Sequence, residues 1–143
     1  MKHQLSELDI KFKFDFEQGS LPLAKFDHRA HIRLAYIYLL GSDTNSAVKN
    51  MRVSLCSYLQ QNSIDVSKYS ETITRAWIIA VRHFIELTDN SVSADDFIDK
   101  NERLLDPNIM LSHYSPKVLF SDRARKSFVR PDIEPIPKHP GIA

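Results

Sequence analysis

Apolar side chains recur at three- and four-residue spacing along three long segments of this chain, residues 26–40, 44–61 and 69–87. In an α-helix this spacing gathers the apolar side chains on one face, whereas a strand would spread them over both faces. The chain also has only three glycines, which argues against a turn-rich β fold and against glycine-rich phosphate loops. We therefore predict an all-α fold in which the three segments are amphipathic helices.

Residues typical of helix ends support these boundaries. Asp27 can cap the first helix, and Gly41 suits the left-handed conformation that ends it. A fourth helix is predicted to begin at Ser93, because Asp96 stands three residues later in an arrangement that resembles a capping box. Ser115-Pro116 has the cap-then-proline pattern that begins a helix. The sequence thus predicts a bundle of four main helices with a short C-terminal helix.

The two ends of the chain are predicted to be extended. Residues 9–17 alternate between apolar and charged side chains, which is strand periodicity, yet no second strand of equal strength is present. This segment lies extended across the helices, pairs with its copy in a dimer, or forms a helix despite the alternation. We favour an extended or partly helical arm over residues 1–19, with a homodimer through this arm as one alternative. Residues 131–143 hold four prolines and are predicted to form an extended tail.

Length and composition define the general class. The 143 residues fit one helical domain spanning residues 1–143. The formal net charge of +1 gives no electrostatic footprint for nucleic acid. No run approaches the roughly 18 apolar residues of a membrane span, and the N-terminus lacks the apolar core of a signal peptide. The single cysteine, Cys56, allows no disulfide within the chain. We expect a cytoplasmic protein without nucleic-acid or membrane partners.

Two histidines distinguish the segment 26–40. With a step of about 100° per residue, His28 and His31 fall on its apolar face, while Arg29 and Arg33 face water. Both imidazoles can reach one point, because positions three apart are neighbours on a helix surface. Neutral imidazole is a common ligand of transition metals. The pair therefore predicts either part of a metal site or two core histidines that are satisfied by hydroxyls or carbonyls.

The helix over residues 69–87 supplies candidate partners for the histidines. Ser70, Thr74 and Trp77 fall on or beside its apolar arc. Glu71 is the candidate third metal ligand, although the helical wheel places it on the opposite side, in a surface pair with Arg75. Small sites in helical bundles are built from polar side chains on facing helices.

These residues define a predicted pocket. His28 and His31 would bind a divalent transition metal (zinc, iron or manganese), and Glu71, His113 or water would complete its ligands. The residues predicted to contact a small-molecule ligand are Ser70, Thr74, Trp77, His113 and Tyr114. Three interpretations stay open: a metal whose bound water reacts, a metal-free site with a histidine as general base, or polar residues that only specify packing.

Three segments of the chain resemble a family of small, uncharacterised bacterial helical proteins. They are F-D-H-R-A-H-I at residues 26–32, Y-S-E-T-I-T at 69–74 and Y-S-P-K-V-L-F-S at 114–121. The family pattern is similar, with F-x-H-x-x-H-L, Y-H-E-T-x-T and Y-S-P-x-x-L-F-S in the same order. The resemblance covers nearly the whole chain after residue 15, and it implies no activity. The family pattern has histidine where this chain has Ser70, so this chain would lack a third imidazole that the resemblance implies.

The sequence favours a small protein with a His-lined site for a metal or a small molecule, and whether the protein is an enzyme stays open. The competing hypothesis is a non-catalytic interaction or structural protein whose core histidines only pack. In that case the arm or the tail would bind a partner or a second copy. A basic run near the C-terminus is either a solvated face or an anion site; it comprises Arg123, Arg125, Lys126 and Arg130.

Overall fold

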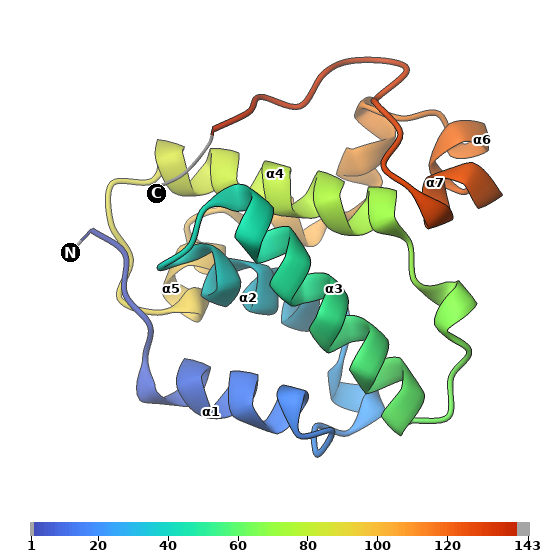
Figure 1. The fold of residues 1–143 in the computed structure, drawn as a ribbon. Helices are drawn as coiled ribbons and strands as arrows, with labels where there is room; N and C mark the ends of the chain where they lie inside the picture. The colour runs from blue at the N-terminus through green and yellow to red at the C-terminus, as the bar shows by residue number, and fades with distance from the viewer. Residues whose placement is uncertain (1, 140–143) are drawn as a thin grey trace.

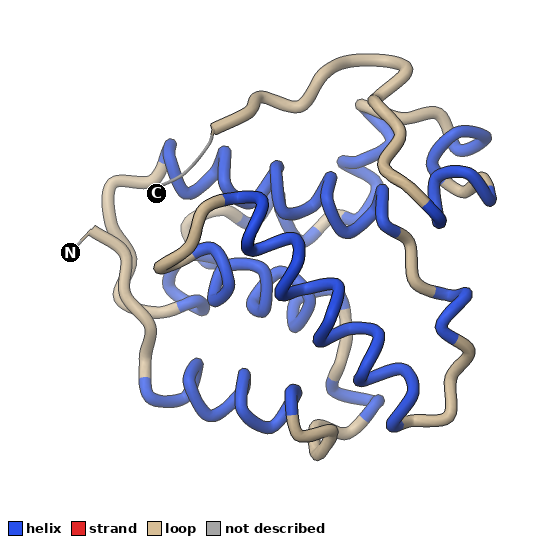
Figure 2. The backbone as a smooth tube through the Cα atoms, viewed as in Figure 1, coloured by secondary structure: helices blue, strands red, loops and turns tan. Residues whose placement is uncertain are grey.

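The computed structural model describes residues 2–139, which form seven α-helices and four short 3₁₀-helices (Figure 1). The α-helices are α1 Glu7–Glu17, α2 His28–Leu39, α3 Thr44–Gln61, α4 Glu71–Leu87, α5 Ala94–Asp99, α6 Pro116–Leu119 and α7 Asp122–Lys126. The 3₁₀-helices are η1 Leu23–Lys25, η2 Val66–Lys68, η3 Glu102–Leu105 and η4 Pro107–Ser112. Figure 2 shows helices and loops but no strand in this part of the chain. The all-α prediction is confirmed.

Helix α2 is the centre of the packing. It contacts α1, α3, α4 and α5, and Figure 1 shows it enclosed among them. The six consecutive residues 34–39 are all buried, so the second half of α2 is covered on every side. Only its first half, which carries Arg29 and Arg33, keeps the amphipathic character that the spacing predicts. The two histidines lie in this first half, at the rim of the core.

The predicted helix caps are present. The Asp27 carboxylate accepts a hydrogen bond from the amide of Ala30 at 2.9 Å and begins α2. Gly41 has φ of +90°, a left-handed conformation that a side chain would disfavour. The Ser93 hydroxyl caps α5 by accepting from the amide of Asp96 at 3.0 Å, and Ser115 caps α6. These local signals therefore placed the helix ends correctly.

The extended arm predicted over residues 1–19 is wrong for Glu7–Glu17, which form α1. A capping box begins this helix: the Ser6 hydroxyl accepts from the Asp9 amide, and the Asp9 carboxylate accepts from the Ser6 amide. Phe12 and Phe16 stand four residues apart and pack on the core side. The alternation is compatible with a helix because every fourth residue of it is again apolar. Among the described residues no strand offers α1 backbone partners, whereas a helix satisfies its own.

The helix predicted to begin at Ser93 is not a main helix but the six-residue α5, and α1 takes its place among the four long helices. Helix α5 ends at Asp99, and η3 and η4 follow it. The Asn101 side-chain amide donates to the Phe97 carbonyl at 2.8 Å and to the Thr88 hydroxyl at 2.9 Å, which holds the chain away from helical geometry. Residues 131–139 contain no helix, as predicted for the tail, and residues 140–143 lie outside the described part.

Candidate functional site

His28 is fixed in place by contacts with two other elements. It is the first residue of α2, and its Nε2 lies 2.9 Å from the carbonyl oxygen of Leu104 in η3. Because a carbonyl only accepts, Nε2 carries the hydrogen of this bond, and Nδ1 of the neutral ring then has a free lone pair. The imidazole also meets the Trp77 ring of α4 edge-on, with centroids 4.8 Å apart. A donated N–H that leaves the other nitrogen free is the arrangement of a typical metal-ligating histidine.

His31 lies one turn further along α2, and its ring has no hydrogen-bond partner among the described residues. Its ring is edge-on to Phe26, with centroids 6.3 Å apart, and its centroid is 6.4 Å from that of His28. Burial, and to a lesser extent the neighbouring His28, lowers the pKa of His31 to about 4. The imidazole is therefore neutral near pH 7 and offers a lone pair that no protein group uses.

Ser70 and its neighbour Thr72 tie the start of α4 to the C-terminal segment. The Ser70 hydroxyl accepts from the Ile73 amide at 3.2 Å and donates to the Ala124 carbonyl at 3.4 Å. The Thr72 hydroxyl donates to the Ser127 carbonyl at 3.0 Å. Thr74, the next hydroxyl on this face, is close enough to the Tyr69 phenol to influence its pKa. The hydroxyls of Ser70 and Thr72 therefore donate to the C-terminal segment and not to the histidines.

Glu71 is held on the side of α4 that faces α3. Its two carboxylate oxygens accept from Nε and Nη2 of Arg52, each at 2.8 Å. The Tyr69 hydroxyl donates to the same carboxylate at 2.8 Å. The guanidinium of Arg52, foremost, lowers the pKa of Glu71. The carboxylate is therefore charged and fully engaged, and the residue that pairs with it is Arg52 rather than the predicted Arg75.

His113 and Tyr114 hold the C-terminal segment. Nδ1 of His113 donates to the Glu134 carbonyl at 2.8 Å, and the buried Tyr114 hydroxyl donates to the Val129 carbonyl at 2.6 Å. Of the predicted site residues, the structure thus brings His28, His31 and Trp77 into contact. The other predicted site residues have their partners away from the two histidines. Among the described residues, no group of three or more His, Cys, Asp or Glu side chains is placed to hold a metal ion.

Sequence reasoning missed Asp9, the most enclosed carboxylate of the described chain, with 1% of its side chain exposed. It accepts from the Ser6 amide at 3.0 Å, the Ala94 amide at 2.9 Å and Nε of Arg33 at 3.0 Å. Burial by itself would raise the pKa of Asp9, but these hydrogen bonds outweigh burial and lower the pKa. The signal was present, because Ser6 and Asp9 have the same spacing as Ser93 and Asp96.

Comparison with known proteins adds nothing to these observations: no family model, no curated protein and no solved structure matches this chain. Each helix within residues 2–139 is too short or too polar to span a bilayer.

Proposed function

We propose that this protein binds a divalent transition metal ion, or a small ligand that replaces it, through the imidazoles of His28 and His31. The observation that carries the proposal is the unused lone pair of His31, a half-buried ring beside a second histidine. The ring nitrogens of His31 bond no protein group within residues 2–139, so they are open to a ligand. A metal ion, or a hydrogen-bond donor from a ligand, would use the free lone pair of His31.

The neutral state of His31 and the hydrogen bond of His28 support metal binding. A metal competes with protons for imidazole nitrogens, so a histidine that stays neutral is a better ligand. The lowered pKa keeps His31 neutral over the physiological range. The carbonyl of Leu104 fixes His28 in the tautomer that exposes Nδ1. Both residues are therefore prepared for coordination before the metal arrives.

Two imidazoles leave the remaining coordination positions of the metal to water or to a ligand. Glu71 is not included in the proposed site, because Arg52 and Tyr69 already bond its carboxylate. Catalytic zinc sites hold the metal with three protein ligands and leave one position open, so a site with two protein ligands would leave still more positions to water or a ligand. This openness is compatible with an enzyme.

General-base catalysis by His31 without a metal is less well supported. The most effective general base has a pKa near the working pH. A histidine whose pKa is about 4 is too weak a base to take up a proton efficiently at pH 7. The lowered pKa therefore favours a ligand role for His31 over proton transfer.

Cobalt titration of the untagged protein tests the proposal. Co²⁺ bound by imidazoles absorbs visible light, so the spectrum reports coordination directly, and calorimetry with Zn²⁺ gives the stoichiometry. We expect one equivalent of metal to bind. We expect His31→Ala to weaken binding at least tenfold, about the effect of losing one ligand, with little loss of stability because this ring has no hydrogen bond to lose.

His83→Ala is the matched control. His83 also faces another histidine, since its Nδ1 lies 3.0 Å from Nε2 of His139. We expect this variant to bind metal like the wild type. Metal binding that survives the double change of His28 and His31 to alanine, but is lost in His83→Ala, would assign the metal to the other pair. Absence of any binding by the folded wild type would equally overturn the metal proposal.

Self-association is the second candidate, and exposed apolar residues on α1 favour it. Ile10 and Phe14 are 58% and 61% exposed and stand one helical turn apart. A second copy of α1 could cover them, which would make α1 the contact of a homodimer. Sedimentation measurements should then show a dimer that Phe14→Ser dissociates and that Leu87→Ser, a change at an exposed leucine of α4, does not. A monomer at all concentrations would exclude it.

A further inference from the structure

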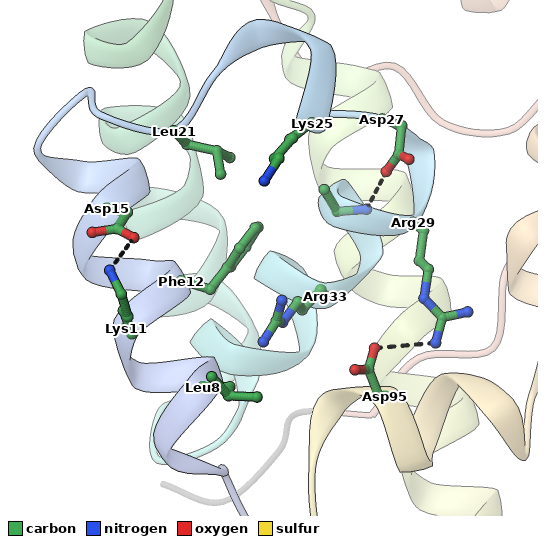
Figure 3. Close-up of a pocket in the computed structure, with 11 residues that line it drawn as sticks. Leu8, Lys11, Phe12, Asp15, Leu21, Lys25, Asp27, Arg29, Arg33 and Asp95 are labelled. Atoms are coloured by element: carbon green, nitrogen blue, oxygen red, sulfur yellow. Dashed lines mark hydrogen bonds and ion pairs between the residues drawn. The ribbon is translucent and has the colours of Figure 1, made fainter.

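A cleft of about 470 Å³ opens between α1, η1 and the first half of α2 (Figure 3). It is separate from the proposed metal site, because neither histidine lines it. Apolar and charged side chains both contribute to its walls. Those used below are Phe12, Leu21, Lys25, Arg29 and Arg33.

The acidic side chains of the cleft already have partners. Asp15 pairs with Lys11 at 2.8 Å, and the carboxylate of Asp27 caps α2. Asp95 accepts from Arg29 at 3.1 Å. Three carboxylates are thus neutralised or engaged in capping within the protein, and they leave little negative charge to repel an anion.

Two cations of the cleft keep unused donors. The side-chain ammonium of Lys25 has no ion pair or hydrogen bond among the described residues. Arg33 bonds Asp9 through Nε alone, so its two terminal amino groups have no protein acceptor within residues 2–139. Figure 3 shows the Lys25 and Arg33 side chains directed into the same space, with Phe12 between them. An acceptor placed there would meet donors from both.

The same cleft offers apolar contact beside these donors. The guanidinium of Arg33 lies over the Phe12 ring, with Cζ 4.4 Å from the ring centroid, so the arginine is held in place from two directions. Leu21 flanks the space next to Lys25 (Figure 3). A fixed guanidinium with a free edge matches a carboxylate well, because its N–H groups can bond both oxygens.

We infer that this cleft binds a small organic carboxylate with an apolar body. The carboxylate would lie between Lys25 and Arg33, and the apolar body would contact Phe12 and Leu21. The volume is within the range of small-molecule sites, and the combination of an apolar wall with few directed polar groups is characteristic of such sites.

Octanoate is the probe that tests this inference, with 1-octanol and inorganic phosphate for comparison. Two-dimensional NMR of the full chain should show shifts at the amides around Phe12 and Lys25 when octanoate is added. Octanol, which lacks the charge, and phosphate, which lacks the apolar body, should each bind at least tenfold more weakly, because each loses one of the two kinds of contact.

Lys25→Gln removes an ammonium that has no structural partner, so folding should not change. We expect it to weaken octanoate binding about tenfold, the effect of one charge-assisted hydrogen bond, and we expect Lys25→Arg to restore it. Lys117→Gln, at an exposed lysine of α6, is the matched control and should have no effect. Octanoate binding that is unchanged in Lys25→Gln, shifts located away from α1, or phosphate bound as tightly as octanoate would each overturn the inference.

Discussion

Replacing Asp9 by asparagine should destabilise the protein strongly, because one buried carboxylate connects three helices. Its oxygens accept from the start of α1, from Arg33 of α2 and from the first amide of α5. Asparagine has nearly the same shape but loses the charge and exchanges one acceptor oxygen for a donor. One of the three donors would then face an amide group that cannot accept.

The magnitude follows from the environment of the pair. Removing one partner of a buried ion pair costs about 3–5 kcal/mol, since the other charge stays buried without compensation. Arg33 is 21% exposed, and water can partly replace the lost carboxylate. We therefore expect the free energy of unfolding to fall by about 3 kcal/mol, the lower end of this range. Against a total stability of about 5–15 kcal/mol, this loss would lower Tm by roughly 10 °C.

Urea denaturation of wild type, Asp9→Asn and Asp15→Asn measures this effect. Asp15 lies on the same helix and pairs with Lys11 at the surface, so the same chemical change there should cost less than about 0.5 kcal/mol. The pKa of Asp9 is lowered in the folded state, so its stabilising contribution is complete above the unfolded value of about 3.9 and is lost as the pH falls through the folded value. Equal costs for the two variants would refute the reasoning.

Three further predictions concern other buried polar groups. The pKa of His31 is lowered to about 4 in the folded state, so stability should fall as the pH drops from about 6.5 towards 4; His31→Gln should flatten this part of the pH profile of urea midpoints. Arg82 donates to the Leu39 and Ser42 carbonyls at the end of α2, and Arg82→Met should cost about 1–3 kcal/mol in chemical denaturation, since both buried acceptors lose a charged donor. Tyr114→Phe removes the hydroxyl bonded to Val129 and should cost about 1 kcal/mol. It should also raise amide hydrogen exchange near Val129 without affecting metal binding.

Long periodic segments were predictable from the sequence because their signal is repeated over many residues. The segment 44–61 is the clearest case, since α3 spans Thr44–Gln61. Short segments were less certain, because the same residues can fit both strand and helical spacing. Residues 9–17 satisfy strand alternation, yet Phe12 and Phe16 also satisfy the helical spacing, and the capping box of Ser6 and Asp9 favours the helix.

The candidate site was only partly predictable, because a helical wheel gives the direction of a side chain but not its partner. Trp77 contacts His28, as expected if both side chains point from their helices into the core. Leu104 could not have been named, because its role depends on a backbone carbonyl 76 residues away in sequence. Glu71 illustrates the opposite error: its nearest charged residue on the wheel, Arg75, is not the cation that binds it.

Contacts between the start of α4 and the C-terminal region largely explain the residues found in segments 69–74 and 114–121. Ser70 and Thr72 bond the backbone of Ala124 and Ser127, and Tyr114 bonds Val129 beyond them. Hydroxyls at these positions therefore have a structural reason that involves no ligand. His31 has no such reason, because no described residue accepts or donates to its ring. Packing thus accounts for the predicted ligand-contact residues of α4 and the C-terminal region. The ring of His31 on α2 bonds no described residue, which is why metal binding is proposed there.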